Sequence, residues 1–143
     1  MIWPTSRLQP HVADSTPGRW PRGPLGVWRA FRWSLQGLCI AWRVEASFRL
    51  EVCAFVVLAP LGLWLGQGGV EKALLVGSLL LVLVGEMLNS AVEALIDRYG
   101  AEQHELAGRA KDMGSAAVFL LLMNALLCWG LLLAPRLHGL LGL

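Results

Sequence analysis

Charge is scarce in this 143-residue sequence: Asp, Glu, Lys and Arg make up only 15% of it, against roughly 25% in an average soluble domain. Hydrophobic residues make up 56%, so the chain has ample apolar surface to bury, and disorder is excluded for most of its length. The scarcity is concentrated in three stretches without a charged residue, which are 52–70, 73–85 and 113–135. Their length and composition disfavour a water-soluble domain and favour membrane-spanning helices.

Several motifs of soluble enzymes are also lacking. The three cysteines, Cys39, Cys53 and Cys128, show neither a CxxC pair nor the spacing of metal ligands, which indicates small apolar side chains with free thiols. No GxxxxGK(S/T) loop and no protein-kinase motif set is present, so a kinase of either of those folds is excluded. The net charge of +2 gives no indication of nucleic acid as a partner.

Residues 1–24 contain five of the seven prolines and few aliphatic residues. They lack the apolar core of a secretory signal peptide, so we expect a flexible, proline-rich arm. The remainder, residues 25–143, is expected to be a single membrane domain.

Residues from about 25 to 49 are expected to form one amphipathic helix. At 100° per residue, arginine, glutamine and serine side chains fall on one face and apolar side chains on the other. Such a helix lies in the bilayer interface with its apolar face buried. Glu45 is the exception, because it falls at the edge of the apolar side. It requires a partner, a metal or a proton, or it pairs with Arg49 one turn later.

Three membrane spans are predicted at about 50–66, 72–98 and 112–134. Seven of the 12 Lys and Arg residues precede the first span, and three lie at the end of the second span or in the loop that follows it. Basic residues are enriched on the cytoplasmic side of a membrane. The N-terminus and the second loop are therefore expected in the cytoplasm, and the first loop and the C-terminus outside.

The second span carries a polar stripe. Its members are spaced i, i+3, i+4, i+7 and i+11 and so share one face of a helix: Glu86, Asn89, Ser90, Glu93 and Asp97. An ionised acid at the bilayer centre costs about 2.5–3.5 kcal/mol, so these carboxyl groups are expected to have a use. From the stripe alone three uses remain open: magnesium binding or general-base catalysis, a proton or cation pathway in a transporter, and hydrogen bonding between helices in a structural protein.

The charged segment that follows, residues 102–112, favours the first of these uses. Lys111 and Asp112 come directly before the apolar third span. A lysine together with free backbone N–H groups at a helix start binds phosphate, and Asp112 can cap that helix or reach a metal-bound water. A proton exporter has no evident use for a lysine and acids together at one membrane face. Phosphoryl transfer uses both, because it depends on positioning and charge neutralisation.

The same residues resemble a known family. The matching motifs are A-W-x-x-E-A-x-F-R-x-E at 41–51, E-x-x-N-S-A-x-E-A at 86–94 with D-R at 97–98, and H-E-L-A-G-R-A-K-D-M-G-S-A-A-V at 104–118. In this register they resemble the small bacterial integral-membrane diacylglycerol kinases over about residues 28–134. Motifs of this length and composition are highly specific.

The resemblance implies an all-α homotrimer in the bacterial inner (cytoplasmic) membrane, in which each subunit has three transmembrane helices and an N-terminal amphipathic surface helix. It implies Mg²⁺-dependent transfer of the γ-phosphate of ATP to the primary hydroxyl of diacylglycerol, which gives phosphatidic acid. An undecaprenol kinase of the same superfamily is the nearest alternative, although residues 98–100 and 114–117 are more similar to the diacylglycerol branch. A non-enzymatic membrane transporter or scaffold is the more distant alternative.

The resemblance also implies roles for individual residues. Glu86 would be the catalytic base, Glu45 and Glu93 would hold magnesium, and the residues that organise the site would be Asn89, Asp97 and Asp112. The residues implied to contact the nucleotide are Trp33, Glu45, Glu93, Glu102, Gln103, His104, Lys111 and Asp112. Those implied to line the lipid groove are Trp42, Phe48, Arg49, Glu51, Glu86, Ser115 and Trp129. Two positions depart from the family pattern: Trp33 stands where the family usually has tyrosine, and Gly26 where it has arginine.

Overall fold

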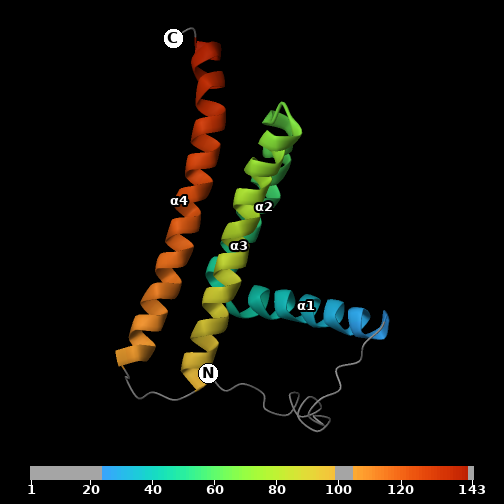
Figure 1. Ribbon diagram of the computed structural model, residues 1–143, viewed down its shortest axis with the longest axis vertical. Coiled ribbons are helices and arrows are strands. Elements are labelled where there is room, and N and C mark those ends of the chain that lie inside the picture. The colour runs from blue at the N-terminus through green and yellow to red at the C-terminus, as the bar shows by residue number, and fades with distance from the viewer. Residues whose placement is uncertain (1–23, 99–104, 142–143) are drawn as a thin grey trace. The chain divides into compact units, whose positions relative to one another are not determined.

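The computed structural model describes residues 24–98 and 105–141, and this part of the chain consists of four helices without a strand (Figure 1). The helices are α1 (Pro24–Val44), α2 (Ala46–Leu65), α3 (Gly69–Arg98) and α4 (Glu105–Leu141). The expected proline-rich arm lies outside the described residues except for Pro24, which begins α1. The predicted nucleotide residues Glu102, Gln103 and His104 also lie outside them.

Three of these helices are long and apolar enough to cross a membrane: Ala46–Leu65, Gly69–Arg98 and Glu105–Ala134. The prediction of an all-helical protein with three candidate spans is therefore confirmed. The helices begin earlier than the expected spans, since α2 starts at Ala46 rather than near 50, α3 at Gly69 rather than at 72 and α4 at Glu105 rather than near 112. The reason is that backbone hydrogen bonding continues into the polar residues beside each apolar stretch, whereas the predicted spans were limited mainly by where charged residues begin.

The predicted continuous helix over 25–49 is interrupted at Glu45. α1 ends at Val44, and Glu45 has the extended backbone angles φ −98° and ψ 118°. The guanidinium of Arg49 donates from Nη1 to the carbonyl oxygens of Trp42 at 3.2 Å and of Arg43 at 3.4 Å. These carbonyls belong to the last turn of α1, where intrahelical donors run out and a cation is favourable. Arg49 therefore caps α1 from the second turn of α2.

The described chain divides into two compact units, with the boundary inside α1 after Leu38. In the first unit, residues 24–38 are helical throughout. The second unit contains the last turns of α1 and all of α2, α3 and α4. The three long helices and the predicted polar stripe therefore lie within one unit.

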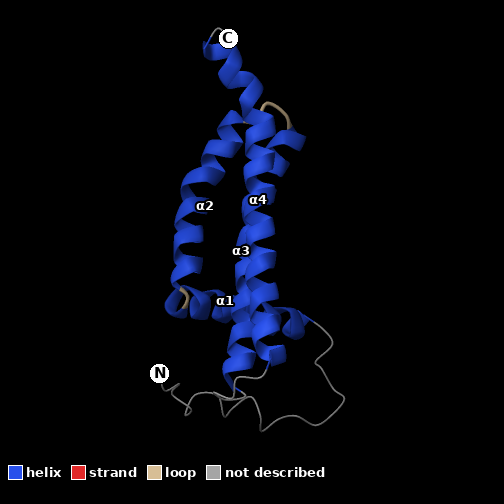
Figure 2. Cartoon of the chain, turned by 90° about the vertical axis from the view of Figure 1, so that its left-hand side faces the viewer, coloured by secondary structure: helices blue, strands red, loops and turns tan. Residues whose placement is uncertain are grey.

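Within this second unit α3 packs against both α2 and α4, as Figures 1 and 2 show. Small residues allow the close approach. A Cβ atom on Gly85 would overlap Leu121 of α4, and a Cβ on Gly62 of α2 would lie 3.2 Å from the Cβ of Leu75. Small side chains at helix contacts are typical of membrane bundles, where van der Waals packing replaces the hydrophobic drive.

The connection between α2 and α3 is a tight turn that begins at Gly66. The backbone N–H of Gly66 donates to the carbonyl of Gly62 at 2.9 Å, and the N–H of Gln67 donates to the Oε2 of Glu71 at 2.9 Å. A side chain at residue 66 would meet the Cγ of Lys72 at 2.6 Å, so the turn requires glycine there. This short turn joins α2 directly to α3, against which it packs.

Candidate active site

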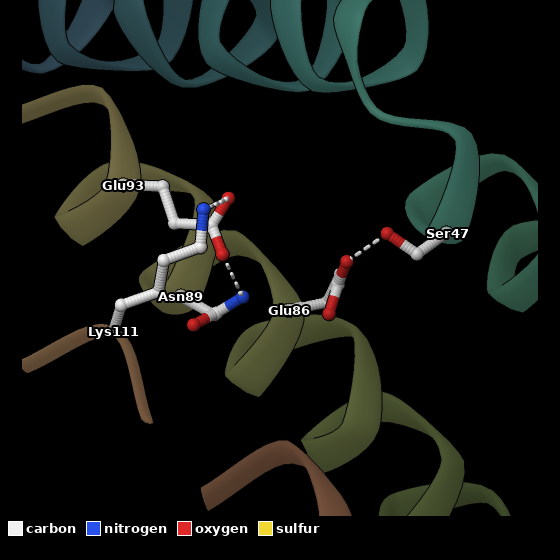
Figure 3. Close-up of polar contacts among 5 residues, drawn as sticks. All are labelled: Ser47, Glu86, Asn89, Glu93 and Lys111. Atoms are coloured by element: carbon white, nitrogen blue, oxygen red, sulfur yellow. Dashed lines mark hydrogen bonds and ion pairs between the residues drawn. The ribbon is translucent and has the colours of Figure 1, made fainter. Parts of the chain in front are cut away.

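Glu86 lies on the inward face of α3 and is only 5% exposed. Its carboxylate accepts a hydrogen bond at Oε1 from the hydroxyl of Ser47, which lies in the first turn of α2 (Figure 3). A buried acid is stable only when it is hydrogen-bonded, paired or protonated. Glu86 therefore belongs to a contact between two helices, at the level of the junction between α1 and α2.

Glu93 lies two turns further along the same face of α3. Its Oε1 accepts from the Nδ2 of Asn89 at 3.4 Å, and its Oε2 lies 3.7 Å from the Nζ of Lys111 on α4 (Figure 3). Lys111 is 55% exposed and Glu93 29%. The structure thus brings together three residues that the sequence predicted for one site. Unlike the side chain of Glu86, the side chains of Glu93 and Lys111 are partly exposed.

Two oxygens near these acids are buried and receive no hydrogen bond from the described residues: Asn89 Oδ1 and Glu51 Oε2. The Oδ1 of Asn89 faces Gly114 of α4, where any Cβ would overlap it. Glu51 lies one turn after Ser47 on α2, and its carboxyl group is close enough to Glu86 for their charges to interact. A buried polar atom without a partner costs about 1–3 kcal/mol, so the polar groups of this region are not all satisfied by the described residues.

Other predicted residues surround the junction of α1 and α2. Glu45 is the residue before α2, and its side chain makes no capping hydrogen bond. The alternative that Glu45 pairs with Arg49 is not supported, because the Arg49 guanidinium caps α1 instead. Phe48 is buried, whereas Trp42 is exposed. Arg49, Glu51 and Phe48 all lie in the first two turns of α2.

The remaining predicted residues are more scattered. Asp97, Asp112 and Ser115 are exposed on α3 and α4, and Trp33 lies in the unit before Cys39. Trp129 is at the other end of the bundle, where its Nε1 donates to the carbonyl of Leu75 at 3.1 Å. Leu75 precedes Glu86 by 11 residues, or about 16 Å of helix. The described residues do not bring Trp129 to Glu86.

Sequence reasoning missed Ser47. It placed the residue on the polar face of one long amphipathic helix, whereas the structure places it on α2 after the break at Glu45. A signal was present: Ser47 and Glu51 are four residues apart and share a face of any helix that begins after Glu45. Two polar residues one turn apart at the start of an apolar span indicate a partner on a neighbouring helix.

The chain is similar to proteins of one family. A family model described as prokaryotic diacylglycerol kinase matches residues 32–133. A diacylglycerol kinase of Escherichia coli (strain K12) is 46% identical over 105 residues, which cover 73% of this chain and 86% of the relative. One from Haemophilus influenzae is 48% identical over 99 residues, with 69% and 84% covered. One from Pseudomonas aeruginosa is 43% identical over 115 residues, with 78% and 94% covered.

Proposed function

The chain belongs to the prokaryotic diacylglycerol kinase family and is a diacylglycerol kinase, and we propose that it transfers the γ-phosphate of ATP to the primary hydroxyl of diacylglycerol. The observation that carries the proposal is the pair of acids on one face of α3. Glu86 is buried, and Glu93 is more exposed and lies beside a lysine. The two are seven residues apart, or about 10 Å along the helix. A lipid hydroxyl arrives from within the bilayer and ATP from water, so the buried acid suits the lipid and the open one suits the nucleotide.

Glu86 is the general base in this proposal. Its carboxylate accepts the hydroxyl proton while the lipid oxygen forms a bond to the γ-phosphorus. The bond from that phosphorus to the β–γ bridging oxygen breaks, and ADP leaves. The products are phosphatidic acid, ADP and a protonated Glu86. Burial of the Glu86 side chain supports this role. A base from which water is excluded exchanges its proton with the bound alcohol rather than with solvent.

The nucleotide phosphates are assigned to Lys111, whose ammonium group already lies at the carboxylate of Glu93. A lysine point charge there neutralises phosphate oxygens during transfer. We assign further nucleotide contacts to Trp33, Asp112, Glu102, Gln103 and His104. Asn89 and Asp97 would organise the site, and the contact from Asn89 to Glu93 supports the first of these two roles.

Glu45 and Glu93 are the residues that would hold Mg²⁺. The donor set fits this ion: both groups are carboxylates, the Glu45 side chain makes no capping bond, and the buried Asn89 Oδ1 lacks a donor among the described residues. The described residues contain no group of three potential metal-ligating His, Cys, Asp or Glu side chains. Mg²⁺ is usually bound through one or two carboxylates, with water and phosphate oxygens completing the shell. When bound, it would neutralise charge on the phosphates.

The lipid is assigned to the side of α2 that leads to Glu86. Phe48, Arg49 and Glu51 lie in the first two turns of that helix, which places them near the acceptor hydroxyl in this proposal. Trp42, Ser115 and Trp129 are further predicted lipid contacts. For Trp129 the contact with Leu75 leaves only the ring available, because its N–H is used.

We further propose a homotrimer in the bacterial inner membrane, with α1 as an interfacial helix and the N-terminus and the second loop in the cytoplasm. The distribution of Lys and Arg supports this orientation. The long apolar face of α4 supports oligomerisation, since few residues of its span are buried within one chain. Three helices alone also cannot enclose an aqueous site, which favours oligomerisation.

A side-by-side kinase assay tests the proposed function. Purified protein in detergent–lipid micelles receives Mg-ATP with either dioleoylglycerol or undecaprenol as the acceptor. We expect phosphatidic acid as the main product. A strong preference for undecaprenol contradicts the assigned acceptor, and the absence of product with either lipid, in protein shown to be folded, contradicts catalysis itself.

A further inference from the structure

We propose that Ser47 is a positioning residue for the Glu86 carboxylate, and that its hydroxyl sets the orientation of this carboxylate toward the lipid hydroxyl. The inference rests on the proposed role of Glu86 as the base. It concerns a residue on α2 that touches neither ATP nor the transferred phosphate in the proposed site. Its observable consequence is a change in turnover without a change in substrate affinity.

The first step of the argument is the chemistry of the contact. Ser47 Oγ donates to Glu86 Oε1. The other oxygen, Oε2, accepts no hydrogen bond from the described residues. A carboxylate that is held at one oxygen can rotate less, so its second oxygen keeps one direction toward an acceptor. A hydrogen bond to a carboxylate is stronger than one between two neutral groups.

The second step is that no neighbouring group can take over this role. Glu51 is close enough to Glu86 for their charges to interact, but no hydrogen bond joins the two side chains, and the buried Oε2 of Glu51 has no partner among the described residues. The amide N–H of Asn89 is directed to Glu93. Among the described residues, Ser47 therefore provides the donor on which the orientation of Glu86 depends.

The third step is that the backbone fixes Ser47. It lies two residues after the extended residue Glu45, in the first turn of α2. Two residues later, Arg49 donates to the carbonyls of Trp42 and Arg43 and holds the junction of the two helices. A donor anchored in this way can orient its partner, because its own position is set by the helix and not by a flexible loop.

The test compares Ser47→Thr with Ser47→Val. The two variants have nearly the same shape, and Ser47 is exposed enough to accept a methyl group, so they differ mainly in the hydroxyl. We expect Ser47→Thr to keep kcat within about twofold and Ser47→Val to lower it about tenfold, as expected for about 1.4 kcal/mol. KM for ATP and for dioleoylglycerol should stay within about twofold in both. Equal kcat values for the pair, or a loss confined to KM, overturn the proposal.

Further variants separate this role from a general loss of structure. Ser34→Ala removes a serine hydroxyl that donates to Ala30 O at 3.1 Å within α1, and it should leave kcat unchanged. Glu86→Asp shortens the base and breaks its contact with Ser47, so adding Ser47→Val should cause no further loss. An independent tenfold loss in that background overturns the proposal. If Glu86→Gln retains full turnover, the proposed base and the role of Ser47 fail together; if Glu86→Gln is inactive and the Thr and Val variants are equal, Ser47 alone fails.

Discussion

Two regions of α3, around Leu75 and around Glu86, differ in how their buried polar groups are hydrogen-bonded. At the Leu75 end, a fully buried residue offers its carbonyl to the indole N–H of Trp129 and to the hydroxyl of Ser78 at 3.0 Å. At the Glu86 end, helices α2 and α4 also contribute polar contacts. There, however, Asn89 Oδ1 and Glu51 Oε2 are buried without a donor among the described residues. Among the described residues, no buried side-chain oxygen or nitrogen is left without a partner at the first end, whereas two are at the second.

The difference teaches how to read polar residues in a span. A satisfied contact between helices holds the bundle together and is worth on the order of 0.6 kcal/mol in membrane proteins. An unsatisfied buried acceptor beside paired acids costs stability, and the proposed binding of substrates at this end would offset that cost. The predictions below test whether substitutions at the two ends separate into losses of turnover and losses of stability.

The largest effect is expected for Glu86→Gln. Loss of the base removes general-base catalysis, which contributes on the order of 10²–10⁴-fold to a rate, so kcat should fall about a thousandfold. The measurement is phosphatidic acid formation in micelles at saturating Mg-ATP and lipid. Turnover near the wild-type value would show that Glu86 is not the base and would contradict the assignment of the active site to this end of α3.

Lys111→Met is expected to have the next largest effect. It removes the positive charge beside Glu93, so phosphate binding weakens, and kcat/KM for ATP should fall about tenfold to a hundredfold. Arg109→Met is the matched control, because it removes one positive charge from an exposed position on the same helix. Equal losses in both variants would indicate a general effect of charge and contradict a specific site at Lys111.

A smaller effect is expected for Gly114→Ala. The new Cβ would overlap the amide of Asn89, which has to move away from Glu93, so kcat should fall about fivefold to tenfold by the displacement of a site residue. Gly130→Ala is the control on the same helix, since nothing lies within 4 Å of its Cβ position. Steady-state kinetics of the two variants decide between the alternatives. Unchanged kinetics in Gly114→Ala would show that the Asn89 amide does not organise the site.

The smallest effect is expected for Ser78→Ala at the Leu75 end. The variant loses the hydrogen bond from Ser78 to Leu75 O, but that carbonyl keeps its bond from Trp129. The free energy of unfolding should drop by about 0.5–1.5 kcal/mol, with kcat and both KM values unchanged. Denaturant-induced unfolding in micelles and the kinase assay measure the two quantities. A loss of turnover at unchanged stability would break the distinction between the two ends.

The sequence was sufficient for features that follow from local periodicity and charge. The three spans follow from the stretches without charge, and the shared face of Glu86, Asn89 and Glu93 follows from the 3.6-residue repeat. The structure confirms an all-helical chain with three candidate spans, and Asn89 and Glu93 are close enough on their shared face to form a hydrogen bond. These features depend on residues within one helix.

The break at Glu45 could not be predicted in the same way, because no proline or glycine marks it. It depends on Arg49, which supplies donors to the end of α1 from the following helix. The contact between Ser47 and Glu86 joins residues 39 positions apart, and the packing of Gly114 on Asn89 joins α4 to α3. Such contacts are set by tertiary packing, which the residue spacing within one helix does not reveal.

The division of labour between the two acids of α3 is tested most directly by the affinity for Mg-ATP, measured as Kd by isothermal titration on the wild type, Glu86→Gln and Glu93→Gln. We expect Glu93→Gln to weaken Mg-ATP binding about tenfold or more, and Glu86→Gln to leave Kd within about twofold of the wild type. Equal weakening in both variants, or an unchanged Kd in Glu93→Gln, would contradict the separation of a nucleotide acid from a lipid acid on this helix.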